Sequence, residues 1–178
     1  MLRSFQALQY VQSYLARKKK TFGQNIVSSL VFHAASLMVK HNASSSAGTL
    51  LTWFIEDGAG VDFFFKLQNE KLNSDNYCDI QRLTEFLSEL TIDEAAPTVD
   101  LIYGPIHVLI AKSKQPNKSL SSRLEKLEIL FAKILEGSKR WRNAFKSYVR
   151  IDNMKKVSAV LEAWSAEGKE IQYVDKNS

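Results

Sequence analysis

The residues best suited to metal binding or nucleophilic chemistry are three histidines and one cysteine, and they are scattered. His33, His41 and His107 each lack a second metal ligand at a usable spacing, and Cys78 has no histidine partner that the sequence identifies. His33 falls near the apolar face of an expected helix, where a structural histidine is commoner than a ligand. We therefore expect no metal site, and we interpret Cys78 as a small core residue.

The carboxylates and glycines give no catalytic or nucleotide-binding pattern either. Glu56 and Asp57 are neighbours, and successive side chains on a helix point about 100° apart, so the two cannot face one substrate atom. The seven glycines stand singly and form no phosphate-binding loop. The sequence therefore predicts a protein that is not an enzyme and that binds no cofactor.

Two cationic stretches remain as candidate functional features. Arg17 to Lys20 contains four consecutive cations, and Lys139 to Arg142 contains three around Trp141. Such stretches are solvated surface, bind an acidic protein surface, or bind nucleic acid. The net charge of +5 over 178 residues is modest, and no nucleic-acid-binding signature appears. RNA binding, with Trp141 as a stacking residue, is therefore kept as an alternative and not as the first interpretation.

Composition favours a folded, helical, cytosolic protein. Apolar residues make up 45% of the chain and charged residues 24%, which is typical of globular domains. Three prolines and seven glycines interrupt the chain rarely, which favours helix. The apolar runs at 61–65 and 106–111 are shorter than a membrane span. With no apolar run of signal-peptide length at its start and a single cysteine, the chain is expected in the cytoplasm.

Hydrophobic residues recur at helical spacing along the whole chain. Leu8, Val11 and Leu15 predict a first helix over 2–18, and a wide apolar face on a second helix suggests burial on two sides. A small polar loop is expected at 42–48, with Ser44, Ser45 or Ser46 capping the helix that follows. Later helices are expected at 49–57, 61–72, 77–90 after caps at 73–75, 98–114 with a kink or break at Gly104-Pro105, 120–135 closed by Gly137, 139–149 and 153–166, with a frayed tail at 168–178.

Helix pairs recur about every forty residues without a repeated signature, which is typical of stacked helical hairpins. The expected architecture is an all-α, right-handed α-solenoid of TPR-like hairpins, formed as one domain over 1–178.

Two segments carry a resemblance to a known family. Segment 5–17, FQALQYVQSYLAR, is similar to the opening helix of the Golgi-to-ER traffic protein four family, and the similarity continues through the second helix, the loop at 40–50 and Leu50 to Glu56. Segment 134–148, ILEGSKRWRNAFKSY, resembles a later part of the same family. The middle of the chain, about 60–115, matches in helical pattern only.

The resemblance implies a scaffold in the delivery of tail-anchored proteins to the endoplasmic reticulum. Family members are α-solenoids about twice this length, whose N-terminal half docks the homodimeric targeting ATPase and whose C-terminal half holds a ubiquitin-like partner. This chain resembles the N-terminal half, without most of the basic helix that usually precedes it. The residues that the resemblance assigns to ATPase binding are Arg17, Lys18 and Lys20, with Gln9 and Gln12 beside them, and Glu56 in regulation of ATP hydrolysis, where Thr49 stands in place of a family aspartate.

Overall fold

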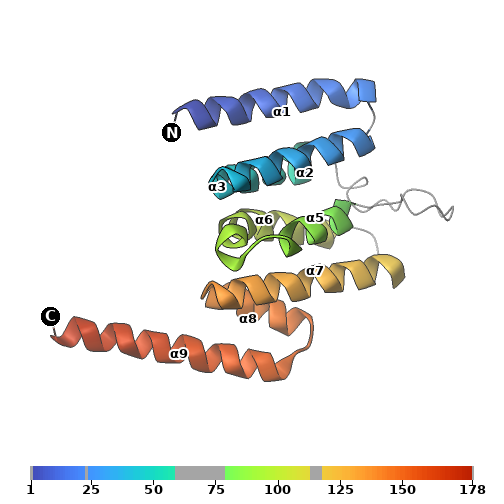
Figure 1. The fold of residues 1–178 in the computed structure, drawn as a ribbon. Coiled ribbons are helices and arrows are strands. Elements are labelled where there is room, and N and C mark those ends of the chain that lie inside the picture. The colour runs from blue at the N-terminus through green and yellow to red at the C-terminus, as the bar shows by residue number, and fades with distance from the viewer. Residues whose placement is uncertain (1, 23, 59–78, 113–117, 178) are drawn as a thin grey trace. The chain divides into compact units, whose positions relative to one another are not determined.

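Every described element of this protein is helical. The computed structural model describes residues 2–22, 24–58, 79–112 and 118–177, and no β-strand occurs within those ranges. The all-α prediction is therefore confirmed. In chain order (Figure 1) the elements are α1 (Leu2–Phe22), α2 (Gln24–Lys40), α3 (Ser44–Trp53), the π-helix η1 (Phe54–Gly58), α5 (Asp79–Ser88), α6 (Ile92–Lys112), α7 (Lys118–Gly137), α8 (Trp141–Arg150) and α9 (Met154–Asn177).

The chain divides into two compact units, Met1–Leu127 and Glu128–Ser178. The first contains α1 to α6 and the start of α7, and the second contains the rest of α7 with α8 and α9. The single domain expected over 1–178 stays a prediction. The helix expected at 61–72, its neighbouring caps at 73–75 and Cys78 lie outside the described residues.

In the first unit α1, α2 and α3 alternate in direction, whereas α3 and α6 pack side by side in the same direction, with Thr98 bonded to Ser44 O and Thr52 bonded to Leu101 O. α1 and α2 run in opposite directions, and α3 packs on both of them (Figure 1). α6 packs along α3 and also contacts η1, while α5 packs on α2. The ring of Phe32 lies 6.2 Å from that of Phe54 and 6.0 Å from that of Phe86. The core of this unit is built from Val27, Val31, Leu50, Leu51, Phe54, Ile55, Ile80, Leu83, Leu87, Ile102 and Ile106.

The first two helices form as expected, with two differences. α1 continues through the cations to Phe22 and does not end near residue 18, because Lys and Arg are good helix formers and nothing among them interrupts the helix. On α2 only one apolar stripe is buried. Ile26, Leu30 and Leu37 are 49%, 38% and 43% exposed, so burial on two sides was wrong for this helix.

The loop expected at 42–48 is mostly helix. The turn that follows α2 ends at Asn42, which has a left-handed conformation (φ 59°), and α3 begins at Ser44. Its N-cap is Ala43, with no side-chain hydrogen bond, so the serine caps were wrong. Gly48 lies inside α3, where a Cβ atom would approach Leu101 Cδ1 to 2.8 Å. The glycine therefore serves close packing of α3 against α6 and does not form a turn.

Helix α6 begins earlier than expected and is not broken. Thr91 and Glu94 form a reciprocal capping box, with Thr91 N–H donating to Glu94 Oε2 at 2.9 Å and Glu94 N–H donating to Thr91 Oγ1 at 3.3 Å. Pro97 and Pro105 both lie inside the helix. Proline at 105 cannot bond the carbonyl of Leu101, but the hydroxyl of Thr52 donates to that oxygen at 3.3 Å. This substitute bond from α3 offsets the loss, and of the expected kink or break the break is absent.

In the second unit α7, α8 and α9 are joined by two tight turns. Lys139 and Asp152 have φ values of 59° and 55°, and the next amide in each case bonds back across the turn, Arg140 N to Leu135 O at 2.8 Å and Asn153 N to Tyr148 O at 3.0 Å. Gly137, expected just past the end of α7, is instead its last residue. The left-handed position is occupied by a lysine.

We predict that Lys139→Gly stabilises the protein. A lysine in the left-handed region carries a steric cost that glycine lacks, so the free energy of unfolding is expected to rise by about 1 kcal/mol. Lys133→Gly is the matched control, because this exposed lysine lies within α7 and its replacement removes helix propensity. Urea denaturation checks both. Destabilisation by Lys139→Gly would contradict the account.

Helix α9 is longer than expected, running through Asn177 instead of ending near 166, so the backbone of the expected tail is helical.

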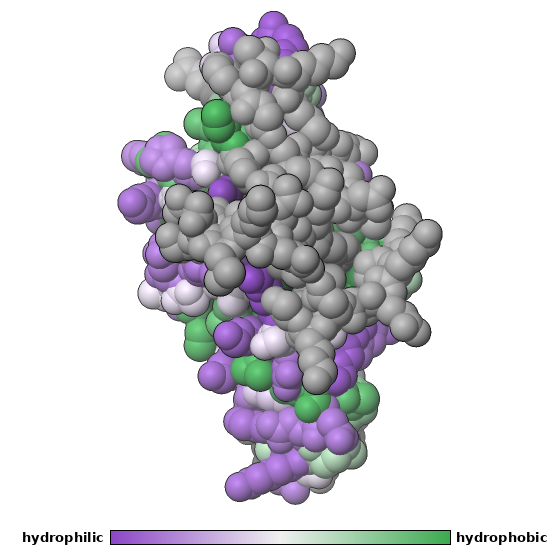
Figure 2. All heavy atoms as spheres, turned by 90° about the vertical axis from the view of Figure 1, so that its right-hand side faces the viewer, coloured by the Kyte–Doolittle hydropathy of each residue, from purple (hydrophilic) through white to green (hydrophobic). Residues whose placement is uncertain are grey.

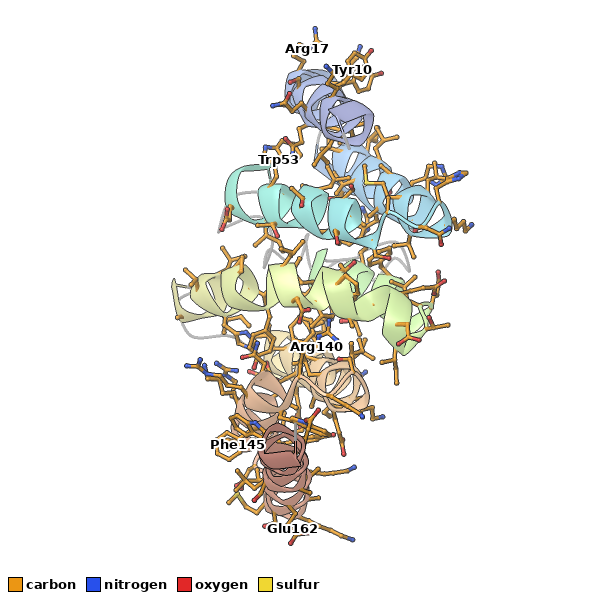
Figure 3. The ribbon with its side chains drawn as sticks, turned by 90° about the vertical axis from the view of Figure 1, so that its left-hand side faces the viewer. Tyr10, Arg17, Trp53, Arg140, Phe145 and Glu162 are labelled. Carbon is orange, nitrogen blue, oxygen red and sulfur yellow. The ribbon has the colours of Figure 1, made fainter. Side chains whose placement is uncertain are left out.

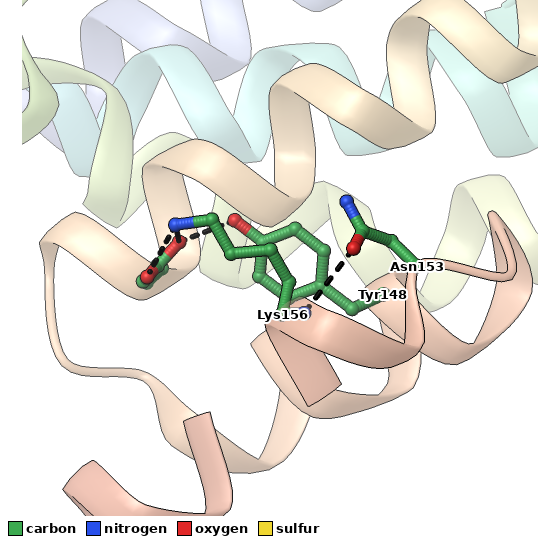
Figure 4. Close-up of polar contacts among 4 residues, drawn as sticks. Tyr148, Asn153 and Lys156 are labelled. Atoms are coloured by element: carbon green, nitrogen blue, oxygen red, sulfur yellow. Dashed lines mark hydrogen bonds and ion pairs between the residues drawn. The ribbon is translucent and has the colours of Figure 1, made fainter. Parts of the chain in front are cut away.

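Tyr148 on α8 links α7, α8 and α9 in a polar network (Figure 4). Its hydroxyl donates to Glu136 on α7, and Lys156 Nζ on α9 lies 3.1 Å from the same carboxylate. Asn153 Oδ1 accepts from Lys156 N–H at 3.2 Å and starts α9.

This network makes the second unit sensitive to acid. Burial opposes ionisation of Glu136, but hydrogen bonds from Tyr148 and Lys156 and the lysine charge outweigh it and lower the pKa of Glu136 below its ordinary value of 4.5. Burial and the Glu136 carboxylate raise the pKa of Tyr148, so its hydroxyl stays protonated as the donor.

The pH dependence of unfolding tests the network. A carboxylate whose pKa is lower in the folded state contributes stability above its unfolded pKa, and that contribution is lost as pH falls through the folded pKa. Wild type is therefore expected to exceed Glu136→Gln in unfolding free energy at about pH 6, with the gap closing toward about pH 3. Denaturant titrations over this range measure the gap. A gap independent of pH would contradict the assignment.

Candidate partner-binding surface

The outer surface of α1 is the candidate functional site. Leu8 and Leu15 are buried and fix the helix on the first unit. Gln9 and Arg17 are exposed, whereas Gln12 and Lys18 are half-buried at the edges of the helix. With 3.6 residues per turn, Gln9 and Gln12 lie toward one edge and Lys18 toward the other. Arg17 lies opposite the buried leucines, between Gln9 and Lys18, so the residues assigned by resemblance spread over the solvent side of the helix and do not form one cluster.

Two tyrosines lie between Arg17 and Lys18 around the helix. The rings of Tyr10 and Tyr14 stack with centroids 6.4 Å apart, and Lys18 Nζ lies 5.6 Å from the centre of the Tyr14 ring. Tyr10 is 66% exposed. Arg17 Nε donates to Ser13 O at 3.3 Å, and Figure 3 shows Tyr10 and Arg17 projecting from the outer side of α1. We define the α1 surface as Tyr10, Tyr14, Arg17 and Lys18.

Sequence reasoning missed the tyrosines. Their signal was the spacing of Tyr10, Tyr14 and Lys18, one every four residues, outside the buried stripe. Tyrosine and arginine are enriched where proteins bind one another, so this arrangement is typical of a partner-binding surface. Lys20 lies in the last turn of α1, but its side chain is outside the described part of the structure.

Glu56 lies at the same end of the first unit as the cations of α1. α1 and α3 each run antiparallel to α2, so both finish at one end, and η1 extends α3 there (Figure 1). Glu56 is exposed on this π-helical turn, a distortion that often accompanies functional sites. Trp53, half-buried, lies on the α1-facing side of α3 (Figure 3). Thr49 donates its hydroxyl to Ser45 O at 3.0 Å.

The histidines lie apart. His33 is exposed on the same side of α2 as the exposed apolar residues Ile26, Leu30 and Leu37, and His41 is exposed beyond α2. His107 Nδ1 lies 2.6 Å from Tyr103 O within α6. Among the described residues no group of three His, Cys, Asp or Glu side chains is placed to hold a metal ion.

No helix in the described part of the chain is both long and apolar enough to span a membrane.

A polar hollow of about 640 Å³ lies where α2 ends and α3 and α6 begin. The first-turn serines of α3 and the acidic residues Asp93 and Glu94 of α6 line it. Glu94 already accepts the Thr91 amide hydrogen in the capping box. Among the described residues that line it there is neither a histidine nor a lysine.

Trp141, the aromatic residue of the second cationic stretch, packs on another helix of the second unit. Trp141 is half-buried, and its indole N–H donates to Glu167 on α9. This contact fastens the start of α8 to α9. A change at Trp141 would therefore disturb packing of the second unit, so loss of RNA binding on its substitution would not identify a stacking site.

Comparison with known proteins adds no identity. No protein-family model, curated protein or solved structure matches this chain.

Proposed function

We propose that this protein is a non-enzymatic adaptor, similar to the N-terminal half of the Golgi-to-ER traffic protein four family, that docks the ATP-bound targeting ATPase of the tail-anchored protein pathway. We also propose that the protein is cytosolic and that its helices form a TPR-like α-solenoid. The alternating directions of α1, α2 and α3 in the first unit support a solenoid of hairpins (Figure 1). By the same resemblance, a ubiquitin-like partner would bind the family's C-terminal half and not the half that this chain resembles.

The observation that carries the proposal is the α1 surface. It combines Arg17 and Lys18 with two accessible tyrosines on one side of the first helix, within the segment that resembles the family. Acidic groups on a partner would pair with the cations, and the tyrosine rings would supply contact area that excludes water. Neither kind of contact needs a catalytic residue.

Charge sets the expected behaviour of this contact. An exposed ion pair contributes about 0.2–1 kcal/mol, so Arg17 and Lys18 act together with Lys20 and the tyrosines. Charged contacts at a rim act mainly on the association rate and weaken as salt rises. Docking should therefore slow at higher salt while the aromatic contacts keep the complex together once formed.

Glu56 is the residue proposed to influence ATP hydrolysis in the docked ATPase. It is exposed, and it lies at the end of the first unit where α1 finishes. Thr49 stands where a family member has an aspartate, and its hydroxyl is already bonded to Ser45 O. We therefore propose that docking is retained and that regulation of ATP hydrolysis is altered or weaker than in the family.

Titration of the full chain against the purified targeting ATPase tests the function. Calorimetry with and without ATP, at low and moderate salt, is expected to show binding that requires ATP and weakens as salt rises. Absence of binding in all four conditions would overturn the proposed function and leave the helical architecture unchanged.

A further inference from the structure

Helix α8 carries a concentrated positive charge that the α1 surface does not explain. Five of the twelve residues from Lys139 to Arg150 are cations, and none is acidic. Buried Ala144, Ser147 and Tyr148 fix one side of the helix in the second unit. The opposite side therefore presents its cations outward.

Two ridges run side by side along that outward side. Residues four apart on a helix lie nearly above one another. One ridge is half-buried Trp141 and Phe145 followed by Val149, which is 47% exposed. The other is the exposed cations Arg142, Lys146 and Arg150. Phe145 projects sideways from the helix (Figure 3), and in Figure 2 hydrophobic and hydrophilic patches lie next to one another over α8 and α9. We call these six residues the α8 surface.

Two of the three cations of this surface have no acidic partner among the residues that the structure describes. Arg150 Nη1 lies 3.7 Å from Glu128 Oε1, a long ion pair with the arginine side chain 42% exposed. Neither Arg142 nor Lys146 has an acidic partner within the part of the chain that the structure describes. A ligand with carboxylates along one side would therefore complement the ridge.

We propose that the α8 surface binds a short acidic segment of a partner protein, whose carboxylates pair with Arg142, Lys146 and Arg150 and whose apolar side chain packs against Phe145 and Val149. Ten helical residues are about 15 Å long, so the site suits a segment of a few turns. An interface of this size is expected to be weak and transient.

The apolar ridge favours a protein segment over nucleic acid or membrane. Single-stranded nucleic acid needs exposed aromatic faces for its bases to stack on, but Trp141 and Phe145 are half-buried and Trp141 is bonded to Glu167. Membrane binding needs a broad apolar face that enters the lipid, but Val149 is the accessible apolar residue of this ridge. A protein segment with several carboxylates and one aliphatic side chain would contact both ridges, because the carboxylates pair with the cations and the aliphatic side chain packs on the apolar residues.

The test uses the full chain and a fluorescent synthetic peptide of glutamate and leucine with helical spacing. Fluorescence anisotropy at low salt is expected to show saturable binding that weakens as salt rises. The double variant Arg142→Glu with Lys146→Glu is expected to weaken binding about tenfold. Its matched control is Lys126→Glu with Lys133→Glu, which makes the same charge change at exposed positions of α7 and should leave binding within about twofold.

A second variant tests the apolar ridge. Val149→Ser keeps every charge and changes a side chain that is about half-exposed, so circular dichroism should show an unchanged fold while peptide binding falls about threefold. Three results would overturn the proposal: no peptide binding, equal loss in both charge variants, or tighter binding to a uridine oligonucleotide or to phosphatidylserine vesicles than to the peptide. None of these measurements involves the ATPase, so they are independent of the proposed function.

Discussion

Replacing Gly48 with valine is expected to lower the free energy of unfolding by about 3 kcal/mol, because it overpacks a close contact between α3 and α6. A Cβ atom at this position would lie 2.8 Å from Leu101 Cδ1, 3.1 Å from Thr98 Cα and 3.2 Å from Leu101 Cβ. The leucine tip can rotate, but the Thr98 backbone cannot move without shifting α6. Guanidinium denaturation followed by circular dichroism measures the loss.

Gly168→Ala is the control for Gly48. This glycine also lies within a helix, and a Cβ atom there would meet nothing within 4 Å. Alanine should therefore raise stability by up to about 1 kcal/mol through helix propensity alone. Similar effects of the two substitutions, in sign and size, would show that propensity governs both sites and that the close α3–α6 contact is wrong.

The double charge reversal Arg17→Glu with Lys18→Glu is expected to weaken ATPase docking at least about tenfold at low salt. Reversal replaces attraction to an acidic surface by repulsion at two positions. Arg17 is exposed, and Lys18 contacts the Tyr14 ring from the edge of the helix, so neither change creates a cavity. Surface plasmon resonance should locate most of the effect in the association rate.

Lys126→Glu with Lys133→Glu serves as the matched control here too, since both lysines are exposed on another helix. The control separates a local contact from the general effect of net charge. Docking that survives the Arg17 and Lys18 reversals, or that falls equally in both double variants, would remove the α1 surface from the proposal.

The buried stripes and most helices were predictable from the sequence, because hydrophobic spacing alone places a residue such as Leu83 or Phe131 in the core. The misplaced boundaries have local causes. The Thr91–Glu94 capping box starts α6 before Pro97, and Thr52 bonds the carbonyl that Pro105 leaves without its usual helix donor. The second effect depends on a partner 49 residues away, which no local pattern contains.

The candidate site was predictable in part. Runs of cations identify Arg17 and Lys18, but hydrophobicity alone assigns Tyr10 to neither core nor surface. Its place became clear only when Leu8 and Leu15 defined the buried side of α1. For the same reason Trp141 was interpreted as a stacking candidate, whereas its bond to Glu167, 26 residues later, makes it a packing residue.

Hydrogen–deuterium exchange of the full chain, with and without the ATP-loaded targeting ATPase, tests the central claim most directly. The account predicts slower exchange in α1 and around Glu56, with no change in α8. Exchange in α1 that is unaffected by a saturating amount of the ATPase would contradict it.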